Sequence, residues 1–193
     1  MSSQPDLMLI LINIGKQIPT FIMLAQVISG FAALYFVGTG IIDLWLANYP
    51  GSEKHFSGAR HASNMGAFAK LFGGGLFACL ATLQLVGVLS RSITGDYVNS
   101  RALSYSTGGG SFAEQAQLAT LAMLGIMQAV GMCAIFRGIT SLIERGNGSK
   151  ETSFGKITIW FIGGLLAWNF KWFSDVVNNT IGFNVISLFT PWS

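Results

Sequence analysis

The sequence predicts an all-α membrane protein with four transmembrane helices arranged as two hairpins. Charged residues are scarce, since 11 basic and 8 acidic side chains make up 10% of the 193 residues, against about 25% in soluble domains. Charges are absent from residues 17–42, 71–90 and 115–136, and from a shorter run at 157–170. A helix needs about 20 apolar residues to cross a bilayer. The first three runs therefore qualify, and the fourth needs its flanks.

The N-terminal part predicts an interfacial segment, residues 1–17, followed by a first transmembrane helix at 18–42. The apolar run at 7–12 is too short to cross a bilayer, and it lacks the basic region and cleavage site of a secretory signal. Pro19 lies near the start of the first long run, where its missing N–H costs little. Polar residues 43–70 form the next loop.

The whole chain, residues 1–193, is expected to form a single membrane domain. Its sequence after residue 70 predicts three more helices and two more loops. The fourth helix reaches spanning length only by passing Lys171, whose long side chain can extend to the interface. Apolar residues of the C-terminal segment share one face of a helix, so we expect an amphipathic segment that is interfacial or half-inserted. These elements are a helix at 71–90, a loop at 91–114, a helix at 115–136, a loop at 137–156, a helix at 157–175 and the C-terminal segment at 176–193.

The basic residues predict the orientation. With four spans, the two loops at 43–70 and 137–156 share one side, and the N-terminal segment, the loop at 91–114 and the C-terminal segment share the other. The two loops carry seven cations: Lys54, Arg60, Lys70, Arg137, Arg145, Lys150 and Lys156. The opposite side carries four: Lys16, Arg91, Arg101 and Lys171. The positive-inside rule then places both loops in the cytoplasm and both termini outside.

The two halves of the chain share a pattern of helix, glycine-containing loop and glycine-rich helix. The first half has residues 36–38, 51–54 and 74–78 in this order, and the second has 136–138, 148–151 and 163–167. A tandem duplication of one hairpin would produce this pattern. A glycine-rich four-helix chain can also produce such matches by chance, so both interpretations stay open.

Small residues recur every four positions on the predicted helices. Such residues allow membrane helices to approach closely, so we expect them to serve packing, either within the chain or between subunits. The candidate packing residues are Ala25, Ser29 and Ala33 on the first helix, Gly74, Ala78 and Thr82 on the second, and Gly163 and Gly164 on the fourth.

Side chains that carry chemistry are nearly absent from the sequence patterns. Cys79 and Cys133 fall inside apolar runs and are interpreted as small packing residues, and His55 and His61 have poor spacing for zinc. No Walker sequence or catalytic triad pattern is present. We expect no enzyme, cofactor or metal site. The dispersed cations argue against direct nucleic-acid binding.

Coupled transport is also disfavoured by the sequence. The middles of the first three predicted helices contain no ionisable residue, although ion and proton pathways depend on such groups. Gln26, Gln84 and Gln128 are the polar residues there, and they can form hydrogen bonds between helices without driving transport.

The chain resembles the IcmC/DotE-type inner-membrane proteins of bacterial type IVB (Dot/Icm) secretion systems, with TraQ-type counterparts in conjugation systems. The resemblance covers essentially the whole chain, and it rests on size, the four-span plan, the segment Pro5–Pro19 and the glycine-containing hairpins. It implies a non-enzymatic, multi-pass inner-membrane subunit with periplasmic termini and a periplasmic loop at 91–114. Such a subunit acts by helix packing in a machine that translocates protein effectors or DNA, in virulence or conjugation.

The expected partners are the lipid bilayer and other inner-membrane subunits, and a homo-oligomer is open. Each half also resembles the pilins of type IV secretion, which would make the chain a fused double hairpin that forms a ring or sheath. The long loop at 43–70 and the lack of an evident leader peptide argue against that alternative. A small stand-alone channel or carrier is the remaining alternative.

The orientation can be tested with single cysteines at Ser57, Ser149, Ser104 and Ser187, introduced into a variant that lacks both native cysteines. We expect the first two positions to be protected from a membrane-impermeant thiol reagent in whole cells, and the last two to react. Labelling of Ser57 and Ser149 from outside would show that the topology is wrong.

Overall fold

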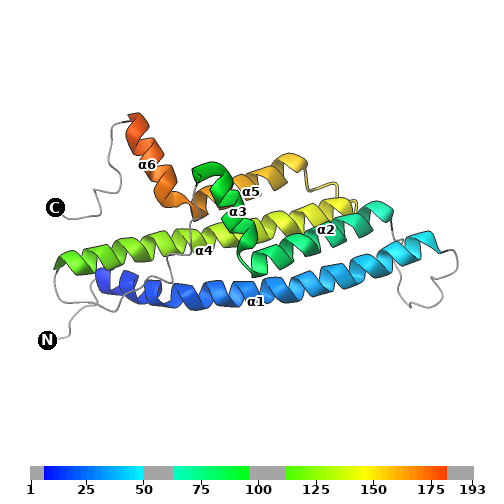
Figure 1. Cartoon of the computed structure of the whole chain (residues 1–193), viewed down its shortest axis with the longest axis horizontal. Helices are drawn as coiled ribbons and strands as arrows, with labels where there is room; N and C mark the ends of the chain where they lie inside the picture. The colour runs from blue at the N-terminus through cyan, green and yellow to red at the C-terminus, as the bar shows by residue number, and fades with distance from the viewer. Residues whose placement is uncertain (1–6, 50–62, 96–111, 182–193) are drawn as a thin grey trace. The chain divides into compact units, whose positions relative to one another are not determined.

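The computed structural model describes residues 7–49, 63–95 and 112–181. These ranges contain six helices and no strand, so the predicted all-α fold class is confirmed for them. The helices are α1 (Leu7–Asn48), α2 (Asn64–Ala81), α3 (Gln84–Thr94), α4 (Phe112–Gly146), α5 (Phe154–Trp168) and α6 (Phe170–Ile181) (Figure 1).

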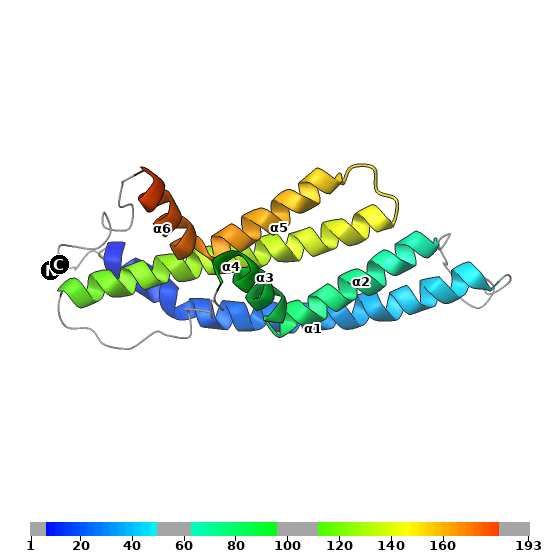
Figure 2. The ribbon, with the colours of Figure 1, turned by 45° about the horizontal axis from the view of Figure 1, so that its top comes forward.

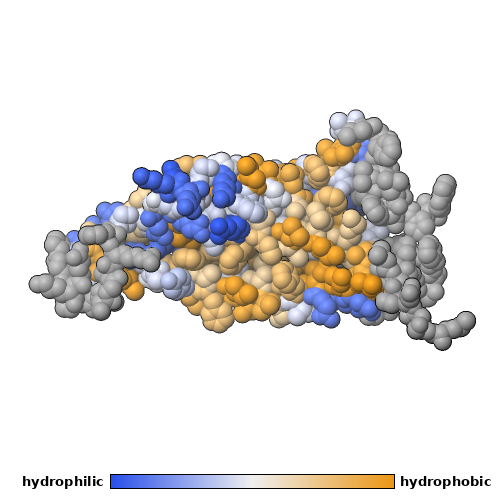
Figure 3. All heavy atoms as spheres, turned by 180° about the vertical axis from the view of Figure 1, so that it is seen from behind, coloured by the Kyte–Doolittle hydropathy of each residue, from blue (hydrophilic) through white to orange (hydrophobic). Residues whose placement is uncertain are grey.

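Three of the described helices, α1, α2 and α4, are long and apolar enough to cross a membrane. Large apolar side chains point outward from them, for example Phe31 and Leu34, which are 69% and 73% exposed. Hydrophobic residues also cover much of the face displayed in Figure 3. Soluble proteins rarely expose apolar patches of this extent, so these features are those of a membrane protein.

The helix α1 is continuous from Leu7 to Asn48 and has 42 residues. The predicted boundary between an N-terminal segment at 1–17 and a helix at 18–42 is therefore absent. Pro19 lies inside the helix, where it removes one backbone hydrogen bond but does not end the helix. The predicted loop at 43–70 is also too long, because its first residues belong to α1 and its last residues to α2.

The predicted helix at 71–90 is interrupted. Its first part belongs to α2, which ends at Ala81, and α3 begins at Gln84. Leu83 between them adopts a left-handed conformation with φ of 58°, and its N–H donates to the Leu80 carbonyl at 3.0 Å. A left-handed residue cannot continue a right-handed helix, so the chain changes direction there.

The predicted helix at 157–175 is likewise divided. The helix α5 has 15 residues and is shorter than a span, and α6 follows after Asn169. Residues 176–181 of the predicted C-terminal segment at 176–193 belong to α6, and residues 182–193 lie outside the described residues. The helix α4 ends at Gly146 instead of the predicted residue 136, which shortens the connection to α5.

The described helices follow the same order of lengths twice. The lengths are 42, 18 and 11 residues for α1, α2 and α3, and 35, 15 and 12 residues for α4, α5 and α6. Both short helices are amphipathic. In each half, the long helix and the one that follows it lie side by side (Figure 2).

The chain divides into two compact units, and several helices contribute to both. Unit 2 comprises Ala25–Val86 and Cys133–Gly163. Its centre is Phe77, which is fully buried. The Phe77 ring stacks on Phe36 of α1 with centroids 5.7 Å apart, and it lies 4.7 Å from the ring of Phe136 of α4. One α2 residue thus joins both hairpins.

Unit 1 comprises three segments of the chain: the residues up to Leu24, Gly87–Met132, and the residues from Gly164 onward. Its core includes Ala122, Met132 and Trp168, all at most 3% exposed. The buried Ser90 hydroxyl of α3 donates to Oδ1 of Asn169 at the α5–α6 junction, at 2.5 Å. This bond joins α3 to the α5–α6 junction.

The left-handed Leu83 provides a test of the α2–α3 break. We expect Leu83→Val to destabilise the protein by about 1–2 kcal/mol, because a β-branched residue is strained at positive φ. The readout is a lower thermal midpoint in detergent. The control is Leu85→Val, the same change within the regular α3 helix, with a smaller effect of about 1 kcal/mol. Equal effects of the two changes would contradict the observed break.

Candidate functional site

The predicted small residues of α1 lie on the inner side of unit 2. Ser29 and Ala33 are buried, at 0% and 6% exposure, and Ala25 is half-buried. The Ser29 hydroxyl donates to the Ala25 carbonyl at 2.7 Å, so its polar group is satisfied within its own helix. This face of α1 is therefore available for packing against α2.

The candidate residues of α2 are divided between two faces. Gly74 meets α1, since a Cβ placed on it would lie 2.7 Å from Val37 Cγ2 and 3.2 Å from the Ala33 carbonyl oxygen. Ala78 and Thr82 are exposed instead. The structure thus brings Ala33 and Gly74 together, but it does not bring the whole α2 series to one interface.

The glycine pair of α5 is also divided. Gly164 is buried in unit 1, and a Cβ on Gly131 of α4 would lie 2.6 Å from its carbonyl oxygen and 2.7 Å from the Trp168 nitrogen. Gly163 is exposed, with nothing within 4 Å of a Cβ placed on it. Gly75 of α2 is open in the same way. Each hairpin therefore has a buried glycine directly beside an exposed one.

Sequence reasoning missed the glycines with the closest approaches. A Cβ on Gly146 would overlap that of Ala69, and a Cβ on Gly73 would overlap the Ile143 side chain. The predicted packing residues of the first two helices are four positions apart, whereas the glycines of α4 at positions 125, 131, 138 and 146 recur about every seven, or two helical turns. That longer spacing was the available signal.

The predicted topology-setting cations have different surroundings. Lys70 forms an ion pair with Asp43, which joins α2 to α1. Arg137 pairs with Glu144 on its own helix at 3.3 Å. Lys150 and Lys156 are exposed. Arg145 is half-buried and donates to the Ser149 carbonyl at 3.3 Å. Lys54 and Arg60 lie outside the described residues.

The two predicted loops leave unit 2 from the same end. A Cβ on Gly66 of α2 would lie 2.8 Å from Oδ1 of Asn147, just after α4. A groove of about 840 Å³ opens there between α2 and the turn from α4 to α5. The residues of the two loops that the structure describes are thus neighbours.

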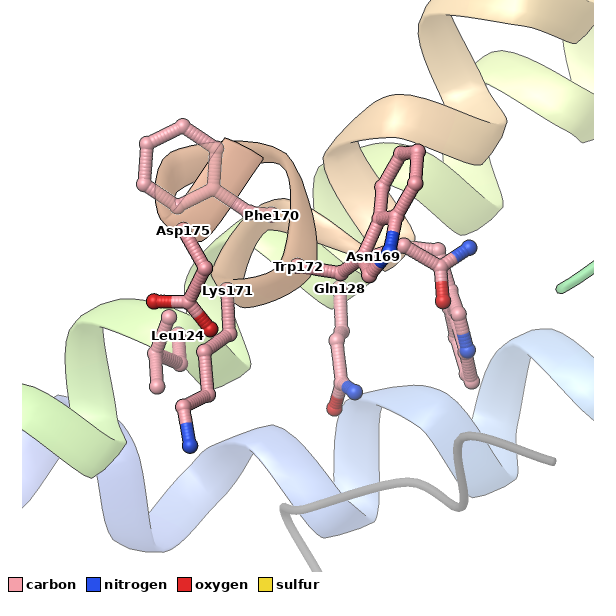
Figure 4. A pocket seen from close by; sticks show the side chains of 8 residues that line it. Leu124, Gln128, Asn169, Phe170, Lys171, Trp172 and Asp175 are labelled. Atoms are coloured by element: carbon pink, nitrogen blue, oxygen red, sulfur yellow. The ribbon is translucent and has the colours of Figure 1, made fainter. Parts of the chain in front are cut away.

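A smaller pocket, of about 150 Å³, lies in unit 1 at the α5–α6 junction. Figure 4 shows Gln128 of α4, and Asn169, Lys171 and Asp175 from the junction and α6, among its lining residues. Gln128 and Asn169 are 2% and 3% exposed, and the Asn169 amide donates to the Leu165 carbonyl at 3.0 Å. The buried polar atoms of Asn169 thus serve the structure of the helix break.

Other predicted features concern single side chains. Gln26 forms the expected bond between helices, since its amide donates to the Ala81 carbonyl at the end of α2, at 3.0 Å. Cys79 and Cys133 are free and exposed, so neither side chain is buried within the chain. No group of three or more metal-ligating side chains occurs within the described ranges; His55 and His61 lie outside them.

Comparisons of the chain with protein-family models, curated proteins and solved structures give no match. The resemblance to the secretion-system family therefore stays a prediction from the sequence.

The Gly131 contact generates a stability prediction. We expect Gly131→Ala to destabilise the protein by about 1–3 kcal/mol, because the added methyl would meet the backbone of α5. The control is Gly163→Ala on α5, where the space is open and the change is expected to be neutral or stabilising by up to about 1 kcal/mol. The readout is thermal unfolding in detergent, and equal effects would contradict the assigned contact.

Proposed function

We propose that this protein is a non-enzymatic subunit of a membrane-embedded assembly, which it joins by packing its helices against those of neighbouring subunits. The observation that carries the proposal is a set of glycines that are exposed and have open space around them. They are Gly38 on α1, Gly75 on α2 and Gly163 on α5. Large apolar side chains surround them on the same helices.

The physical reason is the nature of the bilayer. Lipid tails are as apolar as leucine, so membrane helices associate through close packing and hydrogen bonds, and small residues favour both. This chain uses the same mode internally, where Gly74 meets α1 and Gly131 meets α5. An outward glycine offers a helix of another subunit the same kind of approach.

The parent assembly that we propose is the inner-membrane part of a type IVB secretion or conjugation machine, with both termini in the periplasm. The resemblance in the sequence supports this identity. The basic residues near one end of unit 2, including Arg145, Lys150 and Lys156, support a cytoplasmic position for that end. Effector proteins or DNA would then be the cargo of the whole machine rather than ligands of this chain.

A fused double hairpin that forms a ring or sheath is the second candidate. The repeated order of a long helix, a second helix and a short amphipathic helix favours it. Two similar hairpins in one chain can contact neighbours through similar faces, which suits a closed ring. A ring of identical subunits and a mixed secretion complex differ in composition, which purification measures directly.

The open glycines can be replaced one at a time by leucine in a tagged chain. We expect Gly38→Leu, Gly75→Leu or Gly163→Leu to reduce copurification of neighbouring subunits in mild detergent by about tenfold, since overpacking costs about 1–3 kcal/mol. The protein itself should keep its thermal midpoint, because the space around these positions is open within the chain. Unchanged copurification in all three variants would contradict the proposal.

The matched control is alanine at the same positions, which adds one methyl group and should leave copurification nearly unchanged. Reconstitution of the purified chain in liposomes separates assembly from transport. Movement of small solutes by the chain alone would favour the stand-alone channel or carrier and would overturn the assembly role.

A further inference from the structure

We propose that the groove in unit 2 between α2 and the α4–α5 turn binds one phospholipid with an anionic headgroup. The groove has a volume of about 840 Å³, within the range of about 300–1,000 Å³ that is usual for small-molecule sites. The inference concerns the isolated chain, so it holds or fails independently of the assembly role.

The groove exists because its floor has almost no side chains. Ala69 of α2 and Gly146 of α4 meet there so closely that a Cβ on Gly146 would overlap that of Ala69. Met65, Phe68 and Phe72 rise beside this contact along one face of α2, and each is more than half exposed. Small residues below and large apolar ones beside them produce a channel along the helices.

Arg145 provides the binding group for an anion at the polar end of the groove. Its guanidinium lies 5.4 Å from the centre of the Phe154 ring and donates to the Ser149 carbonyl at 3.3 Å. It forms no ion pair within the described ranges. A guanidinium has five N–H donors, so several remain for a phosphate, which it can hold with two parallel hydrogen bonds.

The nearest carboxylate in the sequence is engaged elsewhere. Glu144 accepts from Arg137 at 3.3 Å and from the Thr152 hydroxyl at 3.4 Å. The segment from residue 137 to 156 also has more cations than anions, because Arg137, Arg145, Lys150 and Lys156 exceed Glu144 and Glu151. The N-terminal end of α2, which carries partial positive charge, borders the same groove at Ser63. The local field therefore favours an anion.

The distribution of polarity along the groove selects the class of ligand. Ser63, Asn147 and Arg145 line it where the helices end, whereas Phe72 and Leu142 line it further along the helices. A phospholipid has the same order, with a charged headgroup at the interface and acyl chains below. A soluble anion would leave the apolar part empty. An entirely apolar segment would leave the Arg145 donors unused, which costs free energy in a low-dielectric site.

The test uses the purified full-length chain in detergent, titrated with phosphatidylglycerol or with phosphatidylcholine of identical acyl chains. Bound lipid is counted by native mass spectrometry. We expect one phosphatidylglycerol per chain, bound about tenfold more tightly than phosphatidylcholine. Arg145→Gln should remove this preference, because both lipids offer a phosphate to the guanidinium but phosphatidylcholine also carries a trimethylammonium that the guanidinium repels. Tenfold corresponds to about 1.4 kcal/mol.

The matched control is Arg137→Gln, which removes the same charge from the same helix outside the groove lining and should keep the preference. Phe72→Ser should weaken both lipids alike, because it changes only the apolar wall. If Arg145→Gln fails to fold, Arg145→Lys replaces it. We expect this variant still to bind phosphatidylglycerol more tightly than phosphatidylcholine, but to bind phosphatidylglycerol less tightly than the native chain does.

Four outcomes would overturn the proposal. They are equal binding of the two lipids, equal losses for Arg145→Gln and Arg137→Gln, displacement of phosphatidylglycerol by excess inorganic phosphate, and no bound lipid at all. The third would identify a site for a free anion, and the fourth would indicate that another part of the chain fills the groove.

Discussion

Close contact of helices at positions without side chains is the constraint on which both units depend. In unit 1 Gly131 meets the backbone of α5, and in unit 2 Gly74 meets that of α1. A bilayer provides no hydrophobic force between helices, so the free energy of association comes from dispersion contacts and hydrogen bonds that need short distances. The same constraint produces the groove. Ala69 and Gly146 can approach closely because they have almost no side chain, and for the same reason they leave the space above them open.

Polar side chains serve the places where helices break. In a bilayer no water is available to backbone carbonyls, so each must find a partner within the protein. Gln26 satisfies the Ala81 carbonyl where α2 ends, and Asn169 binds both Ser90 and the Leu165 carbonyl where α5 gives way to α6. These amides therefore supply side-chain hydrogen bonds at the two places, 82–83 and 169, where the predicted spans are interrupted.

Sequence reasoning identified the fold class and the positions of the long apolar helices because both depend on where charges are absent. It placed helix ends poorly because a charge-free run marks only where a helix can cross a membrane. The left-handed Leu83 divides such a run without any change in composition. Asp43 and Lys70 suggested a loop, yet both lie in helices, where their ion pair offsets the cost of two charges.

The sequence by itself predicted a helical membrane protein from the spacing of its 19 charged residues, and three of the described helices are long and apolar enough to cross a membrane. It also identified small residues as the means of packing. Only the tertiary structure decided which of them are used: Gly74 and Gly164 face a helix of their own chain, and their neighbours Gly75 and Gly163 do not. Two adjacent glycines cannot be told apart from the sequence. Which of them faces a neighbouring helix depends on how the helix is rotated about its own axis, and packing against its neighbours sets that rotation.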